Sequence, residues 1–493
     1  MILDIVSVII SPFMIFLLFI LSYPWYIYII EEYNAITILI HICKGGFHMK
    51  NVYDSYREKL RTPEEAVKVI KSGDWVDYTT NVGFPVLLDD ALSKRRDELF
   101  DVKIRGNLMF GPLKAVECDP TREHFMYNSW HYSAYERRLS DLGLCNYIPM
   151  IFRNLVPYYR HFLTVNVAMM CVTPMDKHGY FNLSCATGVA KGILDKADVV
   201  ILEVNENLPK IYGGFDECIH IDEVDFVVEG EHGPLPQIPL GTPSAEDIKI
   251  ADQIIPYIVD GATLQLGIGD LPNVIGARIA QSDLKDLGMH TELCGDAYYE
   301  LHKSGKLTNR LKNLHCNKSV TGIVFGSQSL YDWVDENPSM MIAPLEYVNA
   351  PKTISKIDNM VSINNCIAVD LYGQISSESA GKRHISGTGG QLDYLTGAAM
   401  SRGGKAFICM NSSHRAKDGT LHSCVRPNFN GDIITSPRSQ AYFLATEYGV
   451  VNLTGSTTWE RAEKLISIAH PDFRDDLIKE AQNQNIWRQS NKR

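Results

Sequence analysis

The 11 cysteines of this 493-residue sequence are odd in number, scattered, and never arranged as a C-x-x-C pair. A zinc site or a disulfide framework would need paired cysteines, so we expect reduced thiols and no metal site. The chain also lacks a basic excess, because 58 acidic residues outnumber 47 basic ones and give a net charge of −11. A nucleic-acid partner is therefore not expected.

Positive charge is missing from the first 43 residues, which contain neither Lys nor Arg. Residues 5–30 are uncharged and long enough to span a bilayer, but a secretory signal would need basic residues before the apolar run. The codons for residues 44–46 (KGG) can read AAAGGAGGN, which contains a bacterial ribosome-binding sequence, and Met49 follows at a suitable distance for an initiator. Residues 1–48 are thus interpreted as upstream DNA translated from an early start codon, or alternatively as an N-terminal hydrophobic anchor.

After Met49 the sequence becomes regular, with short apolar runs between amphipathic segments. This alternation predicts an α/β protein with open, mainly parallel sheets. A helix is predicted from the N-cap Thr62 to Gly73, since Pro63 suits its first position and Glu65 completes a capping box. The clearest predicted strands lie within residues 163–174, 197–205, 261–269 and 405–411.

A stretch rich in proline and glycine, EGEHGPLPQIPLGTPS, occupies residues 229–244 and shows no periodicity. Such composition is typical of a linker. We therefore predict an N-terminal domain over 49–232, a linker over 233–243 and a C-terminal domain over 244–493.

Two glycine-rich turns are candidate ligand sites. LQLGIGDLPNVIGARIA (264–280) reads as a strand, a tight Gly267–Gly269 turn and a helix from near Pro272. Free N–H groups and a helix N-terminus there would suit a phosphate or an oxyanion, although a plain tight turn explains the pattern equally well. A nicotinamide-dependent dehydrogenase is not favoured, because the third glycine and the acidic residue that holds a ribose are both missing.

The second turn, HISGTGGQLDYLTGA (384–398), places Gly387, Gly389 and Gly390 between an extended segment and an apolar helix. Close approach of the backbone to a ligand would explain the missing side chains, and a flexible surface turn is the alternative.

A single glutamate, Glu292, lies between apolar and small residues in DLGMHTELCGDAYYELHKSGKL (286–307). Most glutamates are solvated surface groups, so composition alone does not single it out. Asp296 and Glu300 are predicted as helix-surface charges, and His290 as a core histidine.

These segments together resemble the acetyl-CoA hydrolase/transferase family, a branch of the class I CoA-transferases, over essentially all of 49–493. Within the family, YNSWHYSAYERRL (127–139) and LISIAHPDFRDDLIKEA (465–481) look most like the butyryl-CoA:acetate CoA-transferases, followed by the 4-hydroxybutyrate CoA-transferases. Residues 1–48 have no counterpart. The further motifs that carry the resemblance are TPMDKHGYFN (173–182), VILEVNENLPKIYGG (200–214), VDFVVEG (224–230), LQLGIGDLPN, LGMHTEL, SINNCIAVDLYGQISSES (362–379) and SGTGGQLDY.

The resemblance implies two CoA-transferase-type domains with the active site between them, in a cytoplasmic homo-oligomer. It implies CoA transfer from a short-chain acyl-CoA such as butyryl-CoA to acetate, with no metal or organic cofactor. Glu292 in HTEL matches the family nucleophile, which forms a glutamyl-CoA thioester in a ping-pong reaction. Gly389 matches a donor to the oxyanion, and Asn349 is expected to orient the glutamyl carboxylate. The residues expected to contact CoA or substrate are Gly267, Ile268, Gly269, Asp270, Leu271, Gly387, Gly390 and Lys417, although Lys417 reads equally well as an exposed loop lysine.

Two departures from the family pattern concern the substrate pocket. Asp270 stands where relatives carry a small residue, and Gln328 and Ser329 stand where a lysine-bearing segment is common. The identity of the acid is therefore open, with 4-hydroxybutyrate and propionate transfer or acyl-CoA hydrolysis as alternatives. A non-catalytic, membrane-anchored CoA-binding protein is the alternative outside enzymes, and it requires residues 1–48 to be translated.

Overall fold

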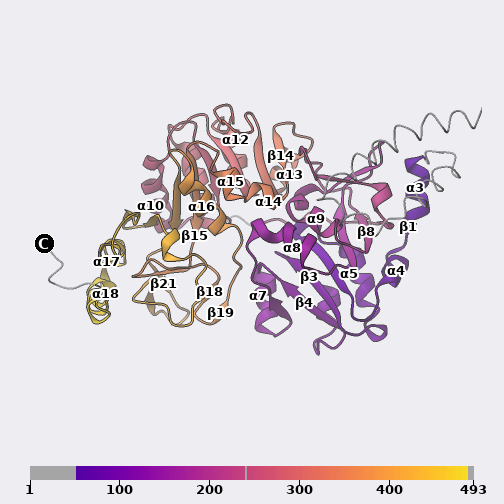
Figure 1. Cartoon of the computed structure of the whole chain (residues 1–493), viewed down its shortest axis with the longest axis horizontal. Coiled ribbons are helices and arrows are strands. Elements are labelled where there is room, and N and C mark those ends of the chain that lie inside the picture. Colours follow the sequence, from indigo (N-terminus) through magenta and orange to yellow (C-terminus); the bar gives the residue numbers. More distant parts are fainter. Residues whose placement is uncertain (1–50, 239–240, 487–493) are drawn as a thin grey trace, which may run out of the picture. The chain divides into compact units, whose positions relative to one another are not determined.

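The computed structural model describes residues 51–238 and 241–486, and the expectations for residues 1–48 concern residues outside these ranges. The fold contains two eight-stranded sheets. In Figure 1 the first is drawn in indigo to magenta and the second in magenta to yellow. The first sheet has the order β1-β10-β8-β6-β2-β3-β4-β5, and all of its strands are parallel. Its strands are β1 (Leu60–Arg61), β2 (Trp75–Thr80), β3 (Val102–Asn107), β4 (Phe125–Ser129), β5 (Cys145–Tyr147), β6 (Val167–Val172), β8 (Val199–Val204) and β10 (Phe226–Glu229).

The second sheet has the order β14-β13-β12-β11-β15-β20-β24-β25, in which only the β24–β25 pair is antiparallel. The prediction of an α/β fold with mainly parallel sheets is therefore confirmed. Its strands are β11 (Thr263–Leu266), β12 (Gly288–Cys294), β13 (Ser319–Val324), β14 (Met340–Ile342), β15 (Met360–Asn365), β20 (Lys405–Cys409), β24 (Phe443–Thr446) and β25 (Gly449–Asn452).

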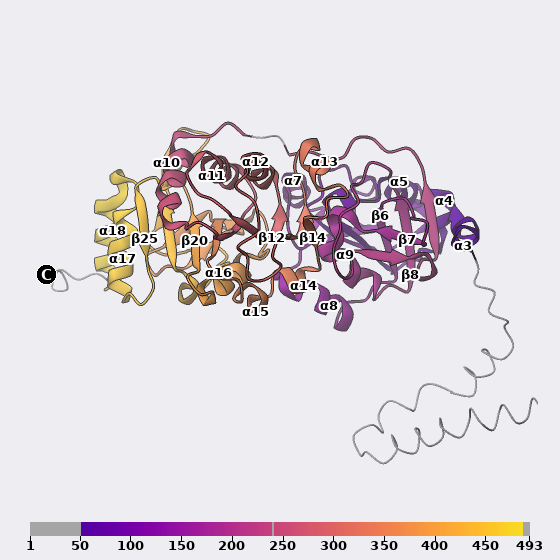
Figure 2. The same ribbon diagram turned by 90° about the horizontal axis from the view of Figure 1, so that it is seen from above.

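Helices cover both faces of each sheet, and in Figure 2 helices α10–α12 lie on one side of the second sheet while α15 and α16 lie on the other. The helices that accompany the first sheet are α3 (Val52–Lys59), α4 (Pro63–Ala66), α5 (Val86–Ser93), α6 (Lys114–Glu117), α7 (Ala134–Asp141), α8 (Leu155–His161) and α9 (Thr187–Leu194). Those that accompany the second are α10 (Ala245–Ile254), α11 (Asp270–Gln281), α12 (Asp296–Lys303), α13 (Gln328–Val334), α14 (Leu345–Val348), α15 (Pro351–Ile354), α16 (Gln391–Met400), α17 (Thr458–Ser467) and α18 (Pro471–Asn483).

Additional short strands lie outside the two large sheets, most of them in the second half of the chain. A hairpin of β21 (Ser413–Arg415) and β22 (Leu421–Ser423) projects from the loop that follows β20. The other short strands are β7 (Tyr180–Asn182) with β9 (Cys218–His220), β16 (Ala368–Asp370) with β17 (Ile375–Ser376) and β23 (Val425–Arg426), and β18 (Ser379–Ala380) with β19 (Arg383–His384).

The apolar strands are buried on both faces, as parallel strands between two helix layers must be. Along β6, Val167 and Met169 pack into one apolar cluster while Ala168 and Met170 pack into another. The second of these clusters continues into the second half of the chain. Because Val52–Arg493 form one compact unit, the predicted domain boundary at 233–243 stays a prediction.

The helix predicted over 62–73 begins as expected but ends early. Thr62 is the N-cap and forms the full capping box with Glu65. The α-helix ends at Ala66, and the chain tightens into a 3₁₀ turn over Val67–Val69.

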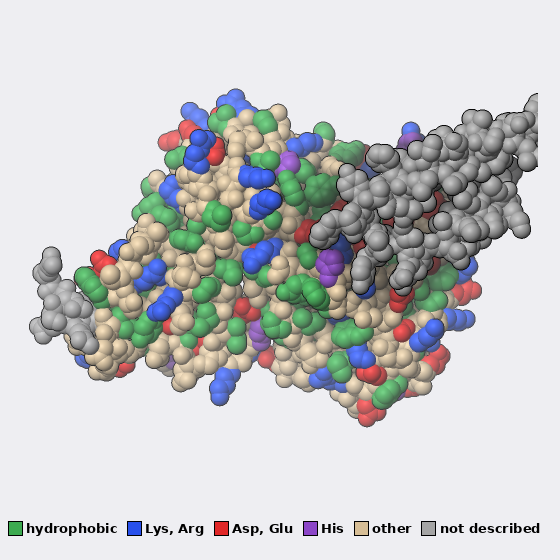
Figure 3. All heavy atoms as spheres, viewed as in Figure 1, with side chains coloured by type: hydrophobic (Ala, Val, Ile, Leu, Met, Phe, Trp, Pro, Cys, Tyr) green, Lys and Arg blue, Asp and Glu red, His purple; other side chains and the backbone are tan. Residues whose placement is uncertain are grey.

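One face of the described surface shows how the charged side chains are distributed. In the view of Figure 3, lysine and arginine side chains are scattered among other types and do not gather into one region. Among the described residues, no helix combines the length and the apolar character needed to cross a bilayer. The ten described cysteines are free thiols.

Candidate active site

The topology of the second sheet places two loops at one point of its carboxyl edge. From β11 the chain adds β12, β13 and β14 on one side and then returns to add β15, β20 and β24 on the other. Ligands bind at such a switch point in open α/β sheets, because neighbouring loops diverge there and leave a crevice. The Gly267–Gly269 turn after β11 and the segment Asn365–Ile367 after β15 both line a cavity of about 460 Å³.

Glu292 lies on β12, one strand away from this switch point, and its side chain reaches the wall of the cavity. Asn349, which is fully buried at the end of α14, donates an N–H to Glu292 Oε2 at 2.5 Å. The Gly390 backbone N–H also interacts with this carboxylate. Two donors therefore hold one side of the carboxylate while the cavity leaves another side accessible.

Burial raises the pKa of Glu292 to about 8, and the donors from Asn349 and Gly390 act in the opposite direction. The nearby Asp393 carboxyl adds to the increase through charge repulsion. A carboxylate that is partly stripped of water and fixed in place is a better nucleophile than one in bulk water.

The glycine loop over residues 387–390 approaches Glu292 more closely than any side chain would allow. A Cβ on Gly390 would lie 2.0 Å from Glu292 Oε2, and Gly389 has a positive φ of 54°. A Cβ on Gly387 would lie 2.5 Å from the Trp130 carbonyl oxygen. The backbone at Gly387 and Gly390 therefore lies close to other groups, as predicted, and Glu292 is one of these groups.

Residues of the first half of the chain hold the glycine loop in place. The Phe152 N–H donates to the Gly389 carbonyl at 3.1 Å, and the Tyr132 N–H donates to the Ser386 carbonyl at 3.2 Å. The Thr388 N–H donates to the Tyr147 hydroxyl at 3.1 Å. The loop is therefore shaped by contacts between the two halves.

Three side chains near Glu292 carry no role in the sequence-based predictions. Arg153 forms an ion pair with the buried Asp393, and Asp393 in turn accepts a hydrogen bond from Asn349. His131 lines the cavity, its Nδ1 has no hydrogen-bond partner among the described residues, and burial lowers its pKa to about 4. His131 belongs to the motif YNSWHYSAYERRL and Asp393 to the motif SGTGGQLDY, so a signal was available for both, whereas no quoted motif contains Arg153.

The other predicted contact residues divide between two cavities. Ile268 lines the cavity with Glu292, as do Gly267, Gly269, Gly387, Gly389 and Gly390. Asp270 and Leu271 open α11 and line a second cavity of about 760 Å³, which shares Asn365–Ile367 with the first. Lys417 lies exposed in the turn of the β21–β22 hairpin and lines neither cavity, although Arg415 of that hairpin lines the second. The role expected for Lys417 stays a prediction.

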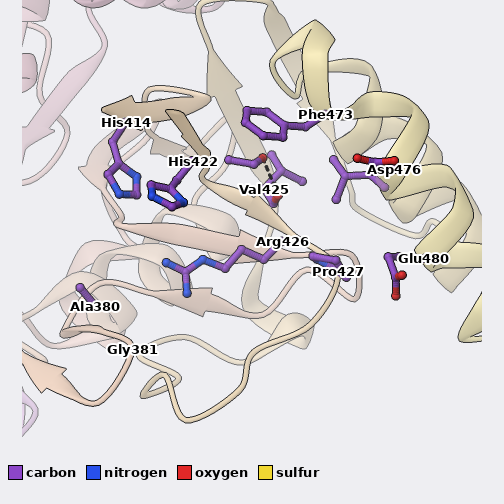
Figure 4. A pocket seen from close by; sticks show the side chains of 12 residues that line it. Ala380, Gly381, His414, His422, Val425, Arg426, Pro427, Phe473, Asp476 and Glu480 are labelled. Atoms are coloured by element: carbon purple, nitrogen blue, oxygen red, sulfur yellow. Dashed lines mark hydrogen bonds between the residues drawn. The ribbon is translucent and has the colours of Figure 1, made fainter. Parts of the chain in front are cut away.

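A third cavity, of about 600 Å³, lies beside α18 and contains none of the predicted site residues. Figure 4 shows His414 and His422 stacked at its edge, with Asp476 and Glu480 projecting from the helix. Basic and acidic groups face the same space, so this cavity does not present a single charge to a ligand.

The predictions for three residues beside Glu292 have different outcomes. His290 is a core histidine as predicted, since its Nε2 lies 2.8 Å from the Val348 carbonyl and the residue is buried. The prediction that Asp296 is a surface charge is wrong, because it is buried at the start of α12 and accepts hydrogen bonds from the N–H and hydroxyl of Ser327. Glu300 is exposed, as predicted, and it forms an ion pair with Lys303.

The two departures near the substrate pocket also lie in different places. Gln328 and Ser329 open α13 as exposed residues and do not line the cavity with Glu292, but Phe325, just before them, does. Asp270 lines the second cavity and not the cavity with Glu292.

One group of side chains in the described ranges has the spacing of metal ligands: Cys171, Glu203 and His232. Glu203 already accepts two backbone N–H groups on Oε2, and Cys171 and His232 both contact Oε1. Hydrogen bonds therefore account for the group. The absence of a metal site from the reaction stays a prediction.

Comparisons with known proteins identify the family. Residues 47–239 match the acetyl-CoA hydrolase/transferase N-terminal domain, and residues 326–481 match the C-terminal domain of the same name. The chain is 47% identical to a butyryl-CoA:acetate CoA-transferase of Anaerostipes caccae, covering 89% of this chain and 99% of the relative. It is 45% identical to a probable butyrate:acetyl-CoA coenzyme A-transferase of Syntrophomonas wolfei, covering 90% and 99%.

A solved structure has the same fold. The 4-hydroxybutyrate CoA-transferase of Porphyromonas gingivalis superposes with a TM-score of 0.72 at 31% identity, covering 88% of this chain and 99% of that one. The chain belongs to the acetyl-CoA hydrolase/transferase family. Within that family it is a CoA-transferase.

Proposed function

We propose that this enzyme transfers CoA from butyryl-CoA to acetate through a glutamyl-CoA thioester on Glu292. The observation that carries the proposal is the Glu292 carboxylate itself, which is oriented by Asn349 and presented to a cavity beside the glycine loop. The choice of butyrate and acetate rests on the names of the two curated relatives.

The reaction exchanges one thioester for another, so no external energy source is needed. The Glu292 carboxylate attacks the carbonyl carbon of the acyl-CoA, the C–S bond breaks, and a mixed anhydride and the CoA thiolate result. The thiolate then attacks the glutamyl carbonyl carbon, which gives the enzyme–CoA thioester and releases the first acid as its carboxylate. Acetate enters and the same two steps run in reverse, so neither a metal nor an organic cofactor is required.

Each attack places negative charge on a carbonyl oxygen next to the glycine loop. The Gly389 N–H is the proposed donor to that oxygen, since the Gly390 N–H already interacts with Glu292. Loss of one such donor typically costs about 2.7–4 kcal/mol of transition-state stabilisation. The Gly267–Gly269 turn is proposed to contact the thioester end of CoA, and Asp270 and Leu271 to border its arm in the second cavity. A cytoplasmic homo-oligomer is part of the same proposal.

The test is to trap the intermediate. The enzyme is incubated with butyryl-CoA, treated with borohydride, digested and analysed by mass spectrometry, and a reduced glutamyl group is expected at Glu292. A modification at another residue, or none during active turnover, would refute the mechanism. A parallel assay with and without acetate separates transfer from hydrolysis, because only transfer requires the acceptor acid.

A further inference from the structure

A continuous set of polar contacts leads from Glu292 to the first half of the chain. The Asn349 amide nitrogen lies 2.5 Å from Glu292 Oε2 and 3.5 Å from Asp393 Oδ2. The backbone N–H of Arg153 donates to Asp393 Oδ2 at 3.2 Å, and its guanidinium pairs with Asp393 Oδ1. Arg153 lies just before α8 in the first half, whereas the other three residues belong to the second.

The orientation of the Asn349 amide decides whether Glu292 faces an N–H donor or a carbonyl oxygen. An amide offers N–H donors on one side and a carbonyl acceptor on the other, and rotation by 180° exchanges the two. Because Asp393 is fully buried and acts as an acceptor, it favours the orientation in which the NH₂ group faces both carboxylates. The opposite orientation would place the amide oxygen against two carboxyl groups.

The buried Asp393 in turn depends on Arg153. A buried carboxylate is unfavourable unless a cation and hydrogen bonds compensate it. Arg153 supplies both kinds of contact, and about a third of its side chain remains exposed. The neighbouring Phe152 N–H binds the Gly389 carbonyl, so one short segment contacts both Asp393 and the glycine loop.

We propose that Asp393 and Arg153 are positioning residues for the reaction, which hold the Asn349 amide in the orientation that directs an N–H at the nucleophile Glu292. The inference rests on the proposed function of Glu292. It also makes the nucleophile dependent on the docking of residues 152–154 from the first half.

The test compares variants of Arg153 in the steady-state CoA-transfer assay. Arg153→Gln is expected to lower kcat by at least about tenfold with little change in KM for the acyl-CoA, since an oriented nucleophile matters for the chemical step. Arg153→Lys keeps the charge and is expected to recover most of the loss. Equal kcat values for wild type and Arg153→Gln would overturn the proposal.

Arg160→Gln is the matched control. Arg160 also pairs across the halves, with Glu346 of α14 at 2.7 Å, and is exposed to a similar extent, but its ion pairs are with Asp195 and Glu346 and not with Asp393. We expect its kcat to stay within twofold of wild type. If Arg160→Gln and Arg153→Gln lowered kcat equally, general docking of the halves would be the cause and the positioning role would be refuted.

The pH dependence of kcat/KM separates a positioning role from a purely structural one, because loss of structure alone would not change the pKa of Glu292. Asp393→Asn removes a negative charge beside Glu292, so the acid limb of kcat/KM is expected to shift to lower pH while kcat falls. His131 and Tyr394 line the same cavity as Glu292, and burial keeps both of them neutral in this range. An unshifted limb in a folded variant would contradict the proposal.

The two proposals fail in different ways. Glu292→Gln is included in the same assay as a reference. Activity in that variant would refute the glutamyl mechanism, whereas an inactive Glu292→Gln with fully active Arg153 and Asp393 variants would refute only the positioning role. Should Asp393→Asn not fold, the Arg153 variants, at a partly exposed side chain, still decide the question.

Discussion

Each sheet carries a glutamate one strand away from the point where its strand order reverses, which lies between β2 and β6 in the first sheet and between β11 and β15 in the second. The two glutamates differ in burial and in what their oxygens contact. Glu203 on β8 is fully buried, and Oε2 accepts N–H groups from Leu87 and Leu88 while Oε1 contacts Cys171 and His232. Glu292 on β12 has donors on one side and a cavity of about 460 Å³ on the other. A carboxylate whose acceptor sites are all occupied holds the fold, and one with a free side is available to react.

The largest effect expected from this comparison is the loss of activity in Glu292→Gln. The amide cannot attack a thioester, so transfer should fall by at least about 10⁴-fold, as when other covalent nucleophiles are removed. CoA transfer is measured at saturating substrates, and circular dichroism reports folding. Glu300→Gln, an exposed glutamate on the following helix, is the control and should remain active. Substantial activity in Glu292→Gln would place the nucleophile elsewhere.

The next effect concerns the space around the reactive carboxylate. Gly390→Ala would bring a methyl group to within 2.0 Å of Glu292 Oε2, so the carboxylate must move. A displacement of about one ångström can cost about 10²-fold in rate, and we expect a decrease in kcat of that order. Gly233→Ala, which meets no atom within 4 Å, should leave kcat unchanged. If both variants behaved alike, the close approach of the glycine loop would have no catalytic consequence.

The pH dependence should also distinguish the reactive glutamate. Only the ionised carboxylate attacks, and its pKa is raised to about 8, so kcat/KM should rise about tenfold per pH unit below 8 and level off above it. Asp393, with a pKa raised to about 7, titrates together with Glu292 as a coupled pair. The profile is measured in initial rates over pH 5 to 9 at roughly constant ionic strength. A limb near the ordinary pKa of a solvated glutamate would show that Glu292 is not buried in the free enzyme.

The smallest effect on catalysis should come from the other glutamate. Glu203→Gln places an NH₂ group where an acceptor is needed, which should lower the free energy of unfolding by about 1–3 kcal/mol. The kcat of the folded protein should stay within twofold. Denaturant unfolding gives the stability, and Glu206→Gln, at an exposed position just after β8, serves as the control. An inactive but fully stable Glu203→Gln would reverse the distinction drawn between the two glutamates.

Much of the fold could be predicted because its signals are local. Apolar runs located the strands, and the capping box at Thr62 located the start of a helix. Its end was predicted too late, since the change to a 3₁₀ turn after Ala66 leaves no mark in composition. Asp296 was misassigned for a similar reason: a charged residue in the first turn of a helix is usually exposed, and here Ser327 from a distant loop covers it.

The candidate site could be predicted only in part. Composition left Glu292 as an ordinary glutamate, and the HTEL motif marked it through the family resemblance. Arg153 and Asp393 are separated by 240 positions in the sequence and meet only in the folded chain. No periodicity or spacing rule connects them, so the sequence alone could not reveal their pairing.

The glycine loop has a consequence for protein engineering. Its shape depends on backbone hydrogen bonds from Phe152 to Gly389 and from Tyr132 to the preceding Ser386, which join residues 237 and 254 positions apart. A chimaera that joined this C-terminal half to the N-terminal half of a relative would keep Glu292, but the residues that bind the glycine loop would come from the relative. Exchange of the halves should succeed best when the segment from about Tyr132 to Arg153 travels together with the second half.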